Sequence, residues 1–237
     1  MSFIIALYVG EGLVFASDSR STYQSSLTNP DGSVTIDHGV HITDTTNKTF
    51  LTSSNVAIST CGDASLNDRP ITGYIESFIG LYGNANVDVV RDEILQYFRG
   101  LSNTLDTIFI VGGYLADNDG RYNQKLYRVK TIDGSIEAID TTRQGAIWSG
   151  ESDVMSRVIT DLYIRNNDGS YSQHVRYPIL WQHLSLQDAV DFAKYAVQIT
   201  IDTMKFQKRV KTVGGPIDIL VVKPDSAQWI SRKVLHG

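Results

Sequence analysis

The sequence predicts an α+β fold, a four-layer αββα sandwich in which two antiparallel sheets lie between two layers of helices. Short apolar runs separated by tight turns indicate antiparallel hairpins. The predicted elements follow the order strands, two helices, strands, two helices and a strand. Because strands and helices do not alternate one by one, a doubly wound parallel sheet is disfavoured. With 237 residues and 42% apolar content, the chain can bury a large core, and we predict a single domain over residues 1–237.

The first two strands form the clearest predicted hairpin. Residues 3–9 and 12–18 are apolar, β-rich runs joined by a Gly-Glu pair that fits a two-residue turn. Antiparallel pairing across this turn places Phe3 opposite Asp18. We therefore expect Asp18 to lie within one residue pair of Ser2.

A polar stretch separates this hairpin from the next one. Residues 19–47 are predicted to form a long loop or a marginal hairpin, because they are rich in Asn, Asp, Gly, Ser and Thr. Residues 48–52 and 55–61 then form a second predicted hairpin. In that hairpin Lys48 falls opposite Thr60 or Cys61.

Helical periodicity and capping signals predict the helices. One helix is expected within residues 64–82, and a clearer one over 87–101, where apolar residues recur at helical spacing. A third helix is expected from Gly150 through Leu162. A fourth runs from Ser185 toward Phe206, with a capping box at its start. The remaining predicted strands are 107–115, 126–130, 135–139 and, last, 217–223.

Composition restricts the classes of function. The net charge of -5, with acidic and basic residues interspersed, disfavours nucleic acid as a partner. Cys61 is the single cysteine, which excludes an internal disulfide and suits a reducing compartment. No signal peptide or long apolar window is visible, so we expect a cytoplasmic protein without a membrane partner. No cofactor or metal ion is expected.

Ser2, directly after the initiator methionine, is the most informative single residue. Removal of Met1 would give Ser2 both a hydroxyl and a free α-amine, whose ordinary pKa of about 7.7–8.0 lets it accept a proton near neutral pH. Serine is a common second residue, so this feature needs support from other residues that converge on it.

That support comes from a resemblance to the proteasome β-type N-terminal nucleophile (Ntn) hydrolases. The residues that carry it are Ser2, the segment Phe-Ala-Ser-Asp-Ser-Arg at 15–20, Lys48, Gly62 and the Trp-Ser-Gly sequence at 148–150. The interval from a processed Ser2 to Asp18 and the interval from Lys48 to Gly62 both match the family. The chain looks most like the bacterial Anbu branch, except that the segment from Asp18 to Lys48 is longer by about fifteen residues than in the wider family.

The resemblance implies a role for each matched residue. Ser2 would be the nucleophile, with its own α-amine as the base. Lys48 would place an ammonium beside the Ser2 hydroxyl, and Asp18 would hold Lys48. The Gly62 backbone N–H would stabilise the oxyanion, and Ser149 would bond the terminal amine. Taken singly, each of these residues could have a purely structural role, whereas their joint order and spacing favour a site.

The resemblance also implies substrate-binding residues and two departures from the family. Thr60 would form the floor of the primary specificity pocket, and Ser21 and Ala64 would contact substrate. The family usually has threonine as nucleophile, so a serine predicts slower turnover. The distal aspartate and serine that support the terminal amine are replaced by Val210 and Val213, and Asp202 or Thr212 could substitute for them.

Three functions are compatible with the sequence. The first is a threonine-type (Ntn) endopeptidase that cleaves peptides or unfolded proteins through an acyl-enzyme on Ser2 and assembles into a ring or helical homo-oligomer. The second is a non-catalytic assembly subunit of the same fold, suggested by the missing aspartate and serine. The third is a small-amide hydrolase, which would need a closed pocket instead of an open cleft.

Overall fold

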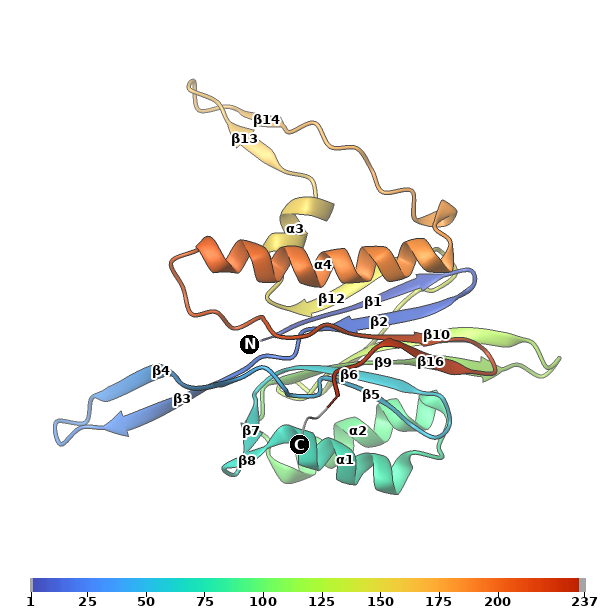
Figure 1. Cartoon of the computed structure of the whole chain (residues 1–237), viewed down its shortest axis with the longest axis horizontal. Coiled ribbons are helices and arrows are strands. Elements are labelled where there is room, and N and C mark those ends of the chain that lie inside the picture. Colours follow the sequence, from blue (N-terminus) through green and yellow to red (C-terminus); the bar gives the residue numbers. More distant parts are fainter. Residues whose placement is uncertain (1, 235–237) are drawn as a thin grey trace.

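The structure is a computed structural model that describes residues 2–234 (Figure 1). These residues form a mixed α+β fold with antiparallel sheets and, within 2–234, four α-helices, as predicted. The first sheet has the order β12 (Gly145–Gly150), β1 (Phe3–Val9), β2 (Gly12–Ser17), β15 (Asp218–Val222) and β16 (Ala227–Ser231). The second has the order β11 (Ser135–Ala138), β10 (Tyr122–Lys130), β9 (Thr107–Ala116), β6 (Ala57–Gly62) and β5 (Thr49–Leu51).

The helices cover the two sheets from opposite sides (Figure 1). Apolar residues of α3 (Asp153–Ile159) and α4 (Leu186–Phe206) form one buried cluster with β1, β2 and β15. Those of α1 (Ile71–Tyr82) and α2 (Val87–Leu101) form another with β6, β9 and β10. A third cluster joins residues of both sheets, among them Phe15, Ile110 and Leu220. These contacts bring the ends of the strands from both sheets into the same region.

The register of the first hairpin agrees with the prediction. Val9 pairs with Gly12, the ladder continues to Ile4 opposite Ser17, and the amide of Asp18 donates to the Phe3 carbonyl at 3.4 Å. In the second hairpin, the Thr60 amide donates to the Lys48 carbonyl at 2.8 Å. Lys48 is therefore opposite Thr60, one of the two predicted partners.

Two helices follow directly from local signals. In α2, Val87, Val90, Ile94 and Phe98 recur at helical spacing and are all fully buried, while the Asn86 side chain caps the first turn. In α4, Ser185 and Asp188 form the predicted capping box. Both helices have the predicted bounds.

The polar stretch after Asp18 forms a projecting hairpin, the second of the two predicted alternatives. Strands β3 (Ser21–Thr28) and β4 (Val34–Thr43) pair with one another and extend away from the body of the molecule (Figure 1). Two further pairs are shorter, β7 (Ser65–Leu66) with β8 (Arg69–Pro70) and β13 (Tyr163–Arg165) with β14 (Tyr171–Gln173).

Several boundaries differ from the prediction. Helix α3 begins at Asp153 and ends at Ile159, whereas the prediction runs from Gly150 through Leu162, and the backbone of Thr160 after it is extended. Strand β10 begins at Tyr122 and not at Leu126. Strand β15 is not the last strand, since β16 pairs with it at the edge of the first sheet. Among the described residues, no helix is long and apolar enough to cross a membrane.

Candidate active site

Asp18 is the organising residue at the end of β2, and it is fully buried. Its Oδ1 accepts hydrogen bonds from the Phe3 amide at 3.0 Å and from Lys48 Nζ at 2.7 Å. Its Oδ2 accepts from the amides of Arg20 and Gly214, both at 3.0 Å. A buried carboxylate is stable only when such partners replace water. Through these hydrogen bonds, Asp18 fixes the backbone at Phe3, Arg20 and Gly214.

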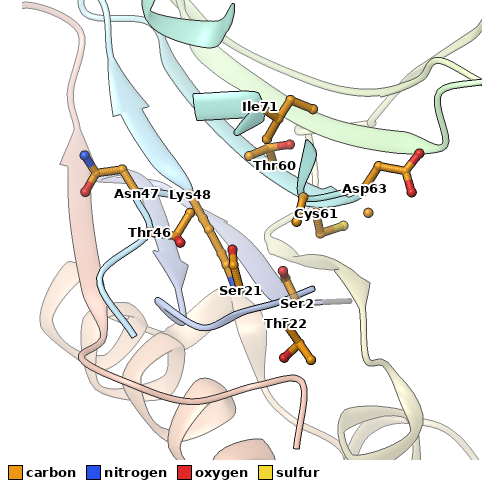
Figure 2. A pocket seen from close by; sticks show the side chains of 12 residues that line it. Ser2, Ser21, Thr22, Thr46, Asn47, Lys48, Thr60, Cys61, Asp63 and Ile71 are labelled. Atoms are coloured by element: carbon orange, nitrogen blue, oxygen red, sulfur yellow. The ribbon is translucent and has the colours of Figure 1, made fainter. Parts of the chain in front are cut away.

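Lys48 lies just before β5 and is almost completely buried, with 3% of its side chain exposed. Its ammonium donates to Asp18 and also to the Arg20 carbonyl. Burial lowers the pKa of Lys48, and the carboxylate of Asp18 opposes this effect. The side chain runs toward Ser21 and Ser2 (Figure 2). Lys48 is thus a desolvated cation beside the candidate nucleophile.

A small recess of ≈ 20 Å³ gathers most of the predicted site residues. Ser2 and Lys48 line it, although they come from different parts of the sequence (Figure 2). Gly62 lines it as well. The predicted substrate-binding residues also line it: Thr60, Ser21 and Ala64. The structure therefore brings together six of the eight predicted residues in one recess, with Asp18 directly behind Lys48.

Gly62 occupies a backbone conformation that other residues rarely adopt, with φ of 118°. A Cβ atom at this position would lie 2.2 Å from the Asp106 carbonyl oxygen. Only glycine therefore fits at the end of β6. The local backbone conformation therefore requires a glycine here.

Cys61 also lines the recess, and its thiol is a second group there that could act as a nucleophile. Burial raises the pKa of this thiol to about 12. Because the thiolate is the reactive form, a thiol with this pKa is a poor nucleophile at neutral pH. The thiol is therefore not favoured over Ser2, whose hydroxyl is the predicted nucleophile.

Ser149, like Asp18, is a predicted site residue that does not line the recess. It lies on β12 opposite Ile4 and is buried. The next residues contact Ser2 directly: the Glu151 amide donates to the Ser2 carbonyl at 2.8 Å. A Cβ atom on Gly150 would lie 1.8 Å from that carbonyl oxygen. The β12–α3 connection thus fixes the backbone of Ser2.

Asp202 and Thr212 are the predicted substitutes for the family's distal aspartate and serine, which are Val210 and Val213 in this chain. Thr212 Oγ1 donates to the carboxylate of Glu151 at 2.7 Å, and Arg209 donates to the same carboxylate at 2.9 Å. Asp202 is not part of this network, because it faces outward on α4 and bonds Gln198 and Lys205. Glu151 and Thr212 therefore form a buried carboxylate–hydroxyl pair on the segment that holds Ser2.

Sequence reasoning missed Glu151, although one signal could have indicated it. An acidic residue directly after the Ser-Gly pair, at the start of a predicted helix, would ordinarily be explained by a favourable interaction with the helix dipole. Only the tertiary contact with Thr212, 61 residues away, distinguishes the two explanations.

The arrangement of the sheets and the position of Ser2 at the start of β1 define the class of the fold, which is a proteasome-like β-type fold. Two Anbu structures are among the solved structures with a similar fold. One is an Anbu (Gly-1) mutant from Hyphomicrobium sp. strain MC1, with a TM-score of 0.56 and 16% identity; the match covers 96% of this chain and 85% of that one. The other is Anbu, an ancestral β-subunit, from Yersinia bercovieri, with a TM-score of 0.54, 14% identity and coverage of 98% and 88%.

No protein-family model matches the sequence, and no curated protein matches it. The comparison with Anbu therefore rests on structure, and at these identities it establishes the fold. It confirms the resemblance to Anbu inferred from the motifs.

Proposed function

We propose that the protein is a proteasome-like N-terminal serine peptidase that cleaves peptide bonds through an acyl-enzyme on Ser2 after removal of Met1. One observation carries the proposal: Ser2, the buried Lys48–Asp18 pair and Gly62 converge on one recess. Apolar residues of similar volume are often as stable as a buried ion pair, although breaking such a pair by removing one partner typically costs about 3–5 kcal/mol. Stability alone therefore does not explain the Lys48–Asp18 pair. Its position beside Ser2 supports an electrostatic role in the proposed reaction.

In the proposed reaction, Ser2 Oγ attacks the carbonyl carbon of the scissile peptide bond and its proton passes to the free α-amine of Ser2. The negative charge moves to the carbonyl oxygen, which the Gly62 N–H stabilises. Collapse of this intermediate breaks the carbon–nitrogen bond, and the α-amine returns the proton to the leaving amine. Water then hydrolyses the ester by the same steps, and Ser2 is regenerated.

Lys48 has an electrostatic role in this reaction. Its ammonium stabilises the developing negative charge near Ser2 Oγ and lowers the pKa of the neighbouring α-amine, because like charges disfavour protonation. Asp18 keeps the ammonium in place. Ser149 lies on β12 opposite Ile4, two residues before the Glu151 amide that bonds the Ser2 carbonyl, and its side chain is proposed to bond the α-amine.

The broader architecture fits this proposal. We interpret the two sheets and their flanking helices as the four-layer αββα sandwich of the Ntn hydrolases, formed by a single domain. The peptidase is proposed to act in the cytoplasm on peptides or unfolded proteins. We also propose that it assembles into a ring or helical homo-oligomer.

An extended substrate is favoured over a small amide. The recess beside Ser2 shares Thr22, Gly62, Asp63 and Ala64 with a larger cavity of ≈ 530 Å³. A continuous cleft of this kind accommodates residues on both sides of a scissile bond. A small-amide hydrolase would instead use a closed pocket.

The test is the intact mass of the purified protein before and after reaction with an electrophile that bonds both the hydroxyl and the amine of an N-terminal serine. We expect loss of Met1, one adduct, and no adduct in Ser2→Ala. Ser77→Ala on the exposed face of α1 is the matched control and should react as the wild type does. An unprocessed mass without an adduct would support the non-catalytic assembly subunit. Turnover of small amides but not of peptides would support the amidase.

A further inference from the structure

The larger cavity beside the recess meets it around Gly62 and has a volume of ≈ 530 Å³. It is lined on one side by the β6–β7 connection and on another by Glu151, Arg209 and Thr212. Because the recess and the larger cavity share residues around Gly62, a peptide whose scissile bond lies at Ser2 would extend into both of them. If Thr60 and the small recess hold the acyl side of the substrate, the larger cavity holds the leaving-group side.

The charged side chains in the lining of this cavity are mostly acidic: Asp63, Asp106 and Glu151, against the cation Arg209. Asp63 and Asp106 are exposed, and no salt bridge involves either carboxylate within residues 2–234. Asp63 is held in place, because its Oδ2 accepts a hydrogen bond from the Asp106 amide at 2.9 Å. The cavity therefore presents two unneutralised carboxylates to a ligand.

The cation in the lining, Arg209, is already engaged by carboxylates. It donates to Glu151 at 2.9 Å and to Asp153 at 3.1 Å. Two acidic partners thus neutralise a single guanidinium, so Arg209 does not offset the charge of Asp63 and Asp106. The local charge of the cavity is negative.

The projecting hairpin supplies the remaining wall. Thr22, Tyr23, Gln24 and Gly39 line the cavity, and they belong to the segment between Asp18 and Lys48 that is longer than in the resembling family. Tyr23 packs against His41, with ring centroids 5.7 Å apart. Tyr23 lines the same cavity as Asp63 and Asp106. A cavity with an aromatic ring and carboxylates suits a side chain with an aliphatic stem and a cationic end, since such a stem packs on apolar surface and the cation pairs with the acids.

We propose that this cavity is the leaving-group subsite and that it selects a lysine or arginine immediately after the scissile bond, with Asp63 and Asp106 as the specificity-determining residues. The proposal rests on the proposed peptidase function and specifies its substrate class. Exposed ion pairs are individually weak, so two of them should give a preference for basic over acidic residues of about tenfold. The preference should decrease at high salt, because salt screens exposed charges.

The first test is digestion of a peptide pool by the Met1-free protein, with cleavage sites identified by mass spectrometry. We expect Lys and Arg to be enriched about tenfold over Asp and Glu directly after the cleaved bond. The variant Asp63→Asn/Asp106→Asn should lose this preference, while the asparagine at position 63 still accepts a hydrogen bond from the amide of residue 106. An unchanged residue preference in this variant would overturn the proposal.

The matched control removes the same charge elsewhere. Asp119 and Asp225 lie in turns outside the cavity lining, and both are exposed. Asp119→Asn/Asp225→Asn should therefore keep the preference for basic residues. If this control loses the preference to the same extent, the effect comes from net charge and the proposed subsite is wrong.

A second test does not depend on catalysis. Calorimetric titration of Ser2→Ala with the tripeptide amides Lys-Ala-Ala and Glu-Ala-Ala probes the leaving-group side alone. We expect the lysine peptide to bind about tenfold more tightly, and Asp63→Asn/Asp106→Asn in the same background to remove the difference. Selective binding without any hydrolysis by the wild type would refute the peptidase and retain the subsite. Hydrolysis by the wild type without selective binding would refute the subsite and retain the peptidase.

Discussion

The Phe3 amide donates a hydrogen bond to Oδ1 of Asp18 at 3.0 Å, and this oxygen also accepts a hydrogen bond from the Lys48 ammonium at 2.7 Å. One carboxylate oxygen thus fixes both the residue that follows the candidate nucleophile and the cation beside it. Any displacement of Asp18 moves Ser2 and Lys48 relative to each other. The geometry of the candidate site depends on this shared acceptor.

Replacement of Asp18 by asparagine should reduce both stability and activity. Asp18→Asn leaves the Lys48 ammonium buried without its counter-ion, and we expect the free energy of unfolding to fall by about 3 kcal/mol or more. We expect kcat/KM on a cleaved peptide to fall at least about 10²-fold. Urea unfolding and steady-state kinetics measure the two effects. Asp225→Asn in an exposed turn is the control, and equal losses in both variants would contradict this role.

Replacement of Gly62 by alanine should prevent the native end of β6. The added methyl group would meet the Asp106 carbonyl oxygen at 2.2 Å and the Thr107 Cα at 2.9 Å, so the backbone must move. Gly32 is the matched control, because it also has a positive φ but has no atom within 4 Å of an added Cβ. Gly32→Ala should cost only about 1 kcal/mol from the strained backbone.

We expect Gly62→Ala to lose activity and more stability than Gly32→Ala, measured by thermal unfolding and peptide hydrolysis. Full activity of Gly62→Ala would show that neither the backbone at position 62 nor its N–H direction matters for the reaction.

Cys61 should be dispensable for the chemistry. Burial raises the pKa of its thiol to about 12, so little thiolate is present at neutral pH. We expect Cys61→Ala to retain hydrolysis, with a stability loss of about 1 kcal/mol from the lost packing. Alkylation of the native wild type by iodoacetamide at mildly alkaline pH should be slow, and fast in urea. Loss of hydrolysis in Cys61→Ala together with rapid native alkylation would transfer the nucleophile's role to the thiol.

The pH dependence of kcat/KM should be bell-shaped. The acidic limb reports the α-amine of Ser2, which must lose its proton to act as a base, and it should lie below the ordinary pKa of about 7.7–8.0 because the Lys48 ammonium disfavours protonation. The alkaline limb reports loss of the Lys48 ammonium. Because burial lowers the pKa of Lys48 from its ordinary 10.5, this limb should lie below pH 10.5. Lys194→Met on the exposed side of α4 should leave both limbs unchanged, whereas Lys48→Met should abolish activity across the range.

Removal of the Thr212 hydroxyl should destabilise the segment that holds Ser2. Thr212→Val deprives the buried Glu151 carboxylate of a donor at 2.7 Å, and we expect a loss of about 1–3 kcal/mol. Thr28→Val on the exposed hairpin is the control and should change the free energy of unfolding by less than about 0.5 kcal/mol. Urea denaturation compares the two variants, and equal effects would mean that Glu151 is satisfied without Thr212.

Patterns within a short stretch of sequence predict the elements that depend on interactions between neighbouring residues. The two-residue turn sets the register of β1 and β2, the capping box at Ser185 sets the start of α4, and the buried stripe of α2 sets its face. For the same reason, hairpin pairing in the sequence is enough to place Asp18 beside Ser2 and Lys48 near Thr60.

Contacts between distant segments cannot be predicted in this way. Strand β16 forms because its backbone pairs with β15 at a sheet edge, and its residues carry only a weak alternating pattern. Glu151 belongs to the site because Thr212 and Arg209 reach it from beyond α4. Beyond the end of helix α3, Asp161 pairs with Arg176, fifteen residues later. In each case the contact joins residues that are remote in sequence.

The segment between α4 and β15 completes the candidate site. Its Thr212 bonds Glu151 on one side of Ser2, and its Gly214 bonds Asp18 on the other. The surroundings of Ser2 and Asp18, near the start of the sequence, are therefore complete only after the segment with Thr212 and Gly214, close to the other end, has folded against them. If the proposed peptidase function holds, a partly synthesised or partly folded chain carries Ser2 without the residues that surround it, and we expect such a chain to be inactive while its own peptide bonds are still exposed.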